Sequence, residues 1–304
     1  MVLALLKSEY TRLSNKGASL IPALTSILIF IFIIPRLLHP VYLLLPHQNM
    51  HIMRTLIASI LHCSALLLCN GLLSILYTKK IPYFEQFRVS QSTPWPWEKD
   101  PVQYNSNRTK VYLSLFINNF ILLPLIIAHS VEADTSPMTA DPQKFPSGLE
   151  ILGQLVFFML AEDCSFYWMH RLVHTGFLYR KIHKQHHEFK TTVGIAATYA
   201  HFLEFIFVDA IPSGLGAALI GNRTHVFTYY MWVFVRIVET TDGHSGFDFP
   251  WSPFRLVFLG GSSSHHDYHH SHIVGNYSSF FTIWDRICGT DLAYKKYCEK
   301  IKGN

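Results

Sequence analysis

One long, uninterrupted apolar run limits the kinds of fold that this chain can adopt. Residues 55–77 cover 23 positions without an Asp, Glu, Lys or Arg, and Lys79 and Lys80 follow them. A helix of that length crosses the hydrocarbon core of a bilayer, which is about 30 Å thick. The composition agrees, because 50% of the 304 residues are hydrophobic and only 15% are charged, whereas roughly 25% are charged in a typical soluble protein. The sequence therefore predicts an integral membrane protein.

Three further apolar runs complete the predicted membrane region, at residues 20–34, 111–128 and 149–168. The expected fold is all-α, with about four transmembrane helices and a cytosolic helical domain rich in histidine. Two parts are expected along the chain. Residues 1–148 form an N-terminal transmembrane region, and residues 149–304 form a catalytic region that begins with the fourth membrane helix.

Two later apolar runs, at residues 202–220 and 226–238, differ from the first four. The former contains Pro212 and glycines, and these predict a bent, membrane-embedded hairpin that returns to the same face. Irregular backbone is tolerated at membrane depth only where protein or a cavity covers it. A substrate cavity that is accessible from the lipid would meet that demand.

The distribution of basic residues orients these helices. The N-terminal tail and the 78–110 connection are both basic, whereas the 36–54 and 129–148 connections carry few Lys or Arg. By the positive-inside rule, the tail, the 78–110 connection and everything after the fourth span face the cytosol. The last residues, KIKGN, place Lys300 and Lys302 as in a dilysine retrieval signal for the endoplasmic reticulum membrane.

Histidines are gathered in three motifs in the second half of the chain. The motifs contain His170 and His174, then His183, His186 and His187, and then His266, His269 and His270. Residues at i, i+3 and i+4 share one face of a helix, whereas adjacent residues lie roughly 100° apart around its axis. Neighbouring histidines therefore reach two ions more easily than one, and no single ion uses eight imidazoles. We interpret the motifs as a dinuclear metal site.

Other uses of these side chains fit the sequence less well. A metal-scavenging tract would be low in complexity, yet the motifs are interleaved with large apolar and aromatic residues. A polar network in a core is the other alternative. The five cysteines form no CxxC pair, which argues against a disulfide framework or a thiolate site. The net charge of +5 is scattered rather than gathered into a stripe, so no nucleic-acid partner is expected.

Three residues outside the motifs are candidates for the same site. His244 stands alone beside glycine between two motifs, either as a ninth ligand or as ordinary polar structure. His201 is a candidate hydrogen-bond partner of a ligand. Asp163 is another, because carboxylates often orient ligating imidazoles, although it could equally cap a helix or pair with Arg171. No catalytic residue beyond the metal centre is predicted.

The three motifs resemble those of the fatty acid hydroxylase and sterol desaturase superfamily. The flanking segments HKQHHEF, TYAHFLE, VETTDGHSGFDFPWSP, HHDYHH, GNYSS and WDRICGTD together resemble the 4-methylsterol monooxygenases. The resemblance covers roughly residues 161–294, whereas the first 110 residues match only in hydropathy. One departure is Phe202, where that family usually has proline, and it concerns the local turn rather than the metal centre.

The resemblance implies a non-haem diiron enzyme of the endoplasmic reticulum membrane. Such an enzyme oxidises a 4-methyl group of a sterol precursor through alcohol and aldehyde to carboxylate. The implied cofactors are two iron ions and O₂, with electrons from NADH through cytochrome b5 and its reductase, and the cofactor supplies the oxidising chemistry. The eight motif histidines carry over as iron ligands, and His244 matches a further family histidine. The chain has no HPGG segment, so the cytochrome is expected to be a separate protein. Other sterol demethylation enzymes are further candidate partners.

Four alternatives stay open at this point. Within the superfamily, a carbon-5 sterol desaturase and a fatty acid or sphingolipid hydroxylase share the motifs, although the NYSS and HSG segments favour the methyl oxidase. Outside it, a metal transporter would carry ionisable residues deep within its spans, whereas these histidines cluster after the spans. A non-catalytic sterol-binding relative would be expected to have lost motif histidines, and none is missing.

Overall fold

The computed structural model describes residues 17–45, 50–132 and 138–302, and its regular structure there is helical. Three isolated β-bridges occur within these ranges, but no strand does. The all-α prediction is therefore confirmed for the described residues. The basic N-terminal tail, parts of the 36–54 and 129–148 connections and the last two residues of the KIKGN segment lie outside them.

Four helices in these ranges are long and apolar enough to cross a membrane, as expected for a multi-pass membrane protein. They are Leu20–Leu43, Ile52–Lys79, Pro101–Ser130 and Phe202–Arg223. The first three contain the predicted runs and lengthen them, because a helix continues until its backbone is capped or interrupted, not until hydropathy falls.

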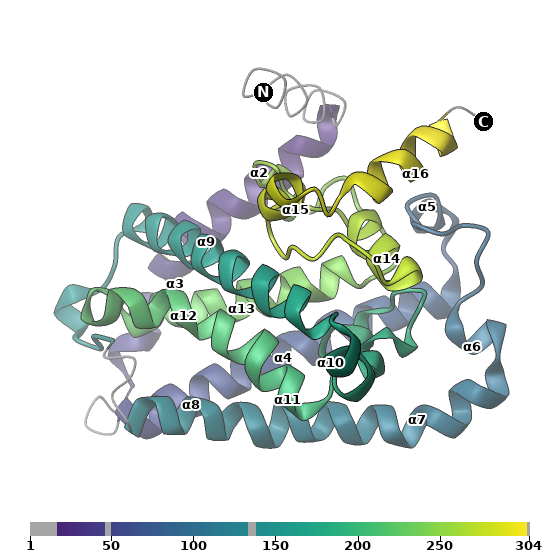
Figure 1. Cartoon of the computed structure of the whole chain (residues 1–304). Helices are drawn as coiled ribbons and strands as arrows, with labels where there is room; N and C mark the ends of the chain where they lie inside the picture. The colour runs from purple at the N-terminus through teal and green to yellow at the C-terminus, as the bar shows by residue number, and fades with distance from the viewer. Residues whose placement is uncertain (1–16, 46–49, 133–137, 303–304) are drawn as a thin grey trace.

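Figure 1 shows how these spans are built from shorter elements. In chain order they are α2 (Leu20–Leu28), π-helical η2 (Ile29–Ile33), α3 (Ile34–Leu43), α4 (Met50–Lys79), α7 (Pro101–Phe116), π-helical η4 (Ile117–Leu122), α8 (Leu123–Glu132), α11 (Phe202–Glu204), π-helical η8 (Phe205–Ala210) and α12 (Ile211–Ile220). The remaining helices are α5 (Pro82–Glu85), α6 (Pro96–Lys99), α9 (Gly148–Val173), α10 (Gly176–Lys181), α13 (Val226–Gly243), α14 (Ser263–His272), α15 (Ile283–Cys288) and α16 (Leu292–Lys302). Short 3₁₀ turns join them, among them η6 (His183–Glu188), η7 (Gly194–Thr198) and η10 (Pro253–Leu256).

Consecutive long helices run in opposite directions between two ends of the molecule (Figure 1). At one end, which we call the histidine end, the hydroxyl of Tyr77 on α4 donates to the carbonyl of Ser245 just after α13, at 2.8 Å. At the far end, Gln154 on α9 donates to the carbonyl of Arg223, at 2.8 Å. The helices α4, α9 and α13 therefore run toward the histidine end, and α7–α8 and α11–α12 run away from it. The connection between α4 and α7, which belongs to the basic 78–110 segment, consequently lies on the side of the histidines.

The fourth span is not the segment that the sequence predicted. The run at residues 149–168 does form a single helix, α9, but that helix carries three carboxylates and is not among the four apolar spans. The fourth is instead Phe202–Arg223, which the sequence predicted to be a hairpin. That prediction was wrong. The chain runs straight through Pro212, because the π-helical turn η8 directly precedes it and a wider turn accommodates the missing N–H and the bulk of the ring.

One glycine of this span, Gly216, serves packing and not bending. A Cβ atom on Gly216 would lie 2.7 Å from the Cα atom of Phe158 on α9, so only glycine permits the close approach of α12 to α9. The neighbouring core is aromatic, with Phe158 packed against Trp232 of α13. Trp232 in turn donates to the carbonyl of Ser213, at 2.7 Å. The helices α9, α12 and α13 thus form one packed unit that ends at the histidines.

Candidate metal centre

Nine histidines converge at the histidine end in two groups. The first group contains His170, His174, His183, His187 and His269, and the second contains His186, His244, His266 and His270. They come from the end of α9, the turn η6, the residue after α13, and α14. Within each group the candidate ligand nitrogens all lie within 4.8 Å of one another. All nine histidines that the sequence singled out as ligands are therefore brought together.

The spacing of the ring nitrogens matches the edges of a coordination polyhedron. The Nε2 atom of His183 lies 3.2 Å from that of His170 and 3.0 Å from that of His187. In the second group, the Nε2 atoms of His266 and His244 are 2.8 Å apart. A metal–nitrogen bond of about 2.1 Å gives edges of about 3.0 Å at right angles and about 3.4 Å for a tetrahedron. Both groups are thus of the right size for one ion each.

The Nδ1 atoms of these rings show which tautomer each imidazole adopts. Five Nδ1 atoms face backbone carbonyl oxygens: His170 with Tyr277 (2.8 Å), His186 with Tyr199 (3.3 Å), His244 with Thr240 (2.7 Å), His269 with Gly275 (2.7 Å) and His270 with Phe189 (3.0 Å). A carbonyl oxygen only accepts, so each of these Nδ1 atoms must carry the proton. The unprotonated Nε2 lone pairs therefore point at one another.

Burial keeps these rings neutral. It lowers the pKa of His187 to about 3 and the pKa of His244 to about 4, so neither ring is protonated near neutral pH. Converging lone pairs repel unless a cation lies between them, and neutral imidazole is a good ligand for iron, zinc and copper. The residues present therefore fit two transition-metal ions.

Sequence reasoning missed a carboxylate that holds one of these rings. Glu204 on α11 accepts a hydrogen bond from Nδ1 of His183, at 2.7 Å, and both side chains are buried. A carboxylate in this position orients a ligating imidazole and raises its basicity. The available signal was an acidic residue at the start of an otherwise apolar run.

The two predicted hydrogen-bond partners of ligands lie elsewhere. Asp163 accepts from the backbone N–H groups of Ser279 (3.2 Å) and Phe281 (3.0 Å), and no hydrogen bond joins it to an imidazole among the described residues. His201 precedes α11, and its Nδ1 accepts from the N–H of Leu203 at 3.3 Å. Asp163 therefore anchors a loop and His201 caps a helix.

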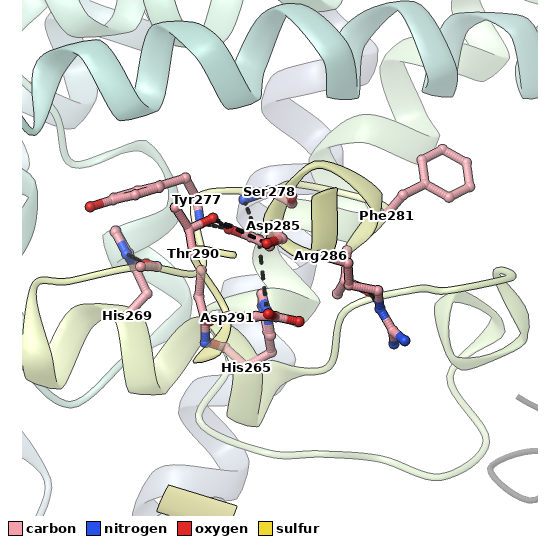
Figure 2. Close-up of polar contacts among 12 residues, drawn as sticks. His265, His269, Tyr277, Ser278, Phe281, Asp285, Arg286, Thr290 and Asp291 are labelled. Carbon is pink, nitrogen blue, oxygen red and sulfur yellow. Dashed lines mark hydrogen bonds and ion pairs between the residues drawn. The ribbon is translucent and has the colours of Figure 1, made fainter. Parts of the chain in front are cut away.

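That loop carries two of the carbonyl groups that fix the ligands, and Asp285 holds it in place. Figure 2 shows the Asp285 carboxylate between three donors. It accepts from the N–H groups of Tyr277 (2.9 Å) and Ser278 (3.0 Å) and from the hydroxyl of Thr290 (2.6 Å). The carbonyl of Tyr277 in turn accepts from His170. Asp285 thus positions His170 through the carbonyl of Tyr277, without touching the His170 ring.

Replacing Asp285 with asparagine is expected to weaken metal binding by about 10- to 100-fold, as is usual when an outer partner of a ligand is removed. The new amide would point a donor at the N–H of Ser278, because each carboxylate oxygen already accepts from the loop. Iron titration of the purified protein measures the change. Glu299→Gln, at an exposed position on α16, is the matched control. An unchanged affinity in Asp285→Asn would contradict the positioning role.

An apolar cavity lies among the membrane helices, beside the second group. It has a volume of about 290 Å³ and lies between α4, α8, α12 and α13. Two of its lining residues, Arg236 and Thr240, also line a smaller pocket of about 40 Å³, and that pocket reaches His244 and His266. Concave, mostly apolar sites with a few polar groups are typical of small-molecule binding. The larger cavity thus suits an apolar ligand, and Arg236 and Thr240 separate it from the pocket at the four-histidine group.

Comparisons with known proteins agree with this arrangement. The fatty acid hydroxylase family matches residues 155–290. The chain is 35% identical to methylsterol monooxygenase 1 of Gallus gallus over 223 residues, which cover 73% of this chain and 72% of that protein. It is 41% identical to methylsterol monooxygenase 1-1 of Arabidopsis thaliana over 163 residues, which cover 52% and 54% of the two chains.

Another kind of relative is equally similar. The chain is 35% identical to very-long-chain aldehyde decarbonylase GL1-8 of Oryza sativa subsp. indica over 240 residues, which cover 78% of this chain and 84% of that protein. No solved structure matches the chain. The length of these matches and the family match over the histidine motifs lead to one conclusion: the chain belongs to the fatty acid hydroxylase family.

Proposed function

We propose that this protein is an O₂-dependent membrane monooxygenase that oxidises a 4-methyl group of sterol precursors to the alcohol, aldehyde and carboxylate. The observation that carries the proposal is the convergence of nine Nε2 atoms in two groups beside an apolar cavity. The methylsterol monooxygenases among the relatives supply the substrate class.

The nine histidines are the proposed ligands of two iron ions. Bound iron and O₂ would supply an oxidant strong enough to attack an unactivated methyl C–H bond. The residues of this chain then have three tasks. The backbone carbonyls and Glu204 hold the imidazoles in the metal-binding tautomer. The cavity positions the apolar substrate, and the helices around it exclude water.

The catalytic region is proposed to comprise residues 149–304, which contain all nine histidines. We place its face in the cytosol of an endoplasmic reticulum membrane protein. Support comes from the basic 78–110 segment, whose non-helical part lies at the histidine end. Electrons are proposed to come from NADH through a membrane-bound cytochrome b5 and its reductase, whose haem face would approach from the same side.

The test is the sterol profile of cells that lack their own carbon-4 methyl oxidase, before and after expression of this chain. We expect accumulated 4,4-dimethylsterol to disappear with the intact chain and to persist with His186→Ala. Persistence of the precursor, although the intact protein is made and binds iron, would refute the methyl-oxidase function.

A second candidate follows from the rice relatives, whose name describes very-long-chain aldehyde decarbonylation. Measuring aldehydes, alkanes and hydroxylated acyl chains in the same cells separates this candidate and a fatty acid hydroxylase from the methyl oxidase. A change in those products with an unchanged sterol profile would favour them.

A further inference from the structure

We propose that His62 recognises a hydroxyl group of the substrate, with its Nδ1 atom accepting the hydrogen bond. This inference rests on the proposed sterol function and names the group that selects the substrate within the cavity. His62 lies on the membrane-spanning part of α4 and lines the 290 Å³ cavity. A polar ring at that depth calls for an explanation, because polar side chains within a span are costly and generally functional or paired.

Asn119 fixes the tautomer of His62. The amide nitrogen of Asn119 donates to the carbonyl of Leu115 at 2.8 Å and to the hydroxyl of Thr198 at 3.2 Å. A backbone carbonyl cannot donate, so the amide cannot be flipped. Its Oδ1 atom therefore faces Nε2 of His62, 2.8 Å away. Because Oδ1 only accepts, Nε2 must carry the proton of a neutral imidazole.

Nδ1 of His62 is then an acceptor that the protein does not use. It has no hydrogen-bond partner in the part of the chain that the structure describes, and its residue lines the cavity. Two cations, Arg54 and Arg236, line the same cavity, which disfavours a positive charge on the ring. The carboxylate of Asp209 also lines the cavity, but Arg236 is its electrostatic partner.

His62 is placed to bind a substrate hydroxyl that lies close to the carbon whose methyl group is oxidised. The Asn119 amide that holds His62 also bonds Thr198, and the next residue, Tyr199, offers its carbonyl to the candidate ligand His186. His62 is thus linked to the second histidine group through a single short segment of chain. In a 4-methylsterol the hydroxyl sits on carbon 3, next to the carbon that bears the reacting methyl group.

The same geometry separates the two classes of relative. A sterol hydroxyl donates a hydrogen bond, whereas an aldehyde oxygen only accepts and gains nothing from Nδ1. A site built to bond a hydroxyl also rejects an analogue that lacks one, because its own polar group then stays unpaired. His62 therefore favours a hydroxylated substrate over an aldehyde or an acyl chain.

The test compares the binding of three probes to the purified, iron-loaded protein in nanodiscs: a 4,4-dimethyl-3-hydroxysterol, its 3-ketone and its 3-methyl ether. We expect the intact protein to bind the hydroxysterol about three- to tenfold more tightly than either analogue, as befits one neutral hydrogen bond. In His62→Phe, which keeps a ring of similar size, the three affinities should become equal.

Ser213→Ala is the matched control, because Ser213 lines the same cavity but its hydroxyl already donates to the carbonyl of Asp209 at 2.7 Å. Its preference for the hydroxysterol should be unchanged. If His62→Phe does not accumulate, His62→Leu replaces it, since leucine fills part of the same space and carries no hydrogen-bond acceptor, and its preference should also fall. Equal binding of the three probes by the intact protein, or an unchanged preference in the His62 variants, overturns the inference. Binding of none of the probes by the iron-loaded protein would instead refute the sterol function itself.

Discussion

Replacing His266 with alanine is expected to lower the iron content from two ions to about one per chain and to slow methyl oxidation at least about a hundredfold. His266 lies at the centre of the second group, with its Nε2 atom 2.8 Å from that of His244 and 3.2 Å from that of His270. This is the group that the small pocket reaches. Loss of a residue that merely supports a ligand costs 10–100-fold, so loss of a ligand should lower the rate at least about a hundredfold.

The measurements are the iron content of the purified protein and its turnover of a 4-methylsterol. His272→Ala is the matched control, because His272 lies on the same helix α14 but outside both groups. It should keep two irons and near-normal turnover. Full iron content in His266→Ala would show that the second group does not bind metal as proposed.

Replacing Arg236 with methionine is expected to destabilise the protein by about 3–5 kcal/mol, the usual cost of leaving a buried charge without its partner. Arg236 on α13 lies between the two cavities. Its Nε lies 3.0 Å from a carboxylate oxygen of Glu162, and its Nη1 lies 2.9 Å from one of Glu239. Glu162 is fully buried, so removal of the guanidinium leaves its carboxyl group in an apolar core.

Thermal unfolding in detergent measures this loss, and a triple variant provides the rescue. Replacing Glu162 and Glu239 with glutamine in the Arg236→Met background removes the unpaired carboxylates and should restore much of the stability. Arg223→Met, at an exposed position, is the control and should change little. If Arg236→Met unfolded at the temperature of the intact protein, the ion pairs would contribute nothing to stability.

The histidine spacing predicted that these side chains form two groups, for a local reason. Adjacent histidines point in different directions whatever the surrounding fold, so His186 and His187 were expected to serve different ions. In the structure His187 belongs to the first group and His186 to the second. His244, isolated in the sequence, joined the second group because it directly follows α13, whose end lies beside α14.

The prediction of a hairpin at residues 202–220 failed because the role of a glycine or proline there depends on the helices packed against it. Glycines near Pro212 indicate a bend when they are read along the chain, yet Gly216 is there because Phe158 packs against it. The π-helical turn that lets the helix pass through Pro212 has no clear sequence signature. Hydropathy also favoured α9 as a span, although it carries the buried Glu162, which forms an ion pair with Arg236, and Asp163, which accepts from loop N–H groups.

The sequence by itself determined the class of the protein, because the length and apolarity of the spans and the spacing of the histidines depend only on local geometry. The all-α membrane architecture follows from the spans, and the prediction of a two-ion site follows from the histidine spacing. Only the tertiary structure decided which groups orient the candidate metal ligands and His62. Glu204, Asp285 and Asn119 act across contacts between residues 8 to 57 positions apart. Such contacts are set by the packing of helices against one another, which no local pattern encodes.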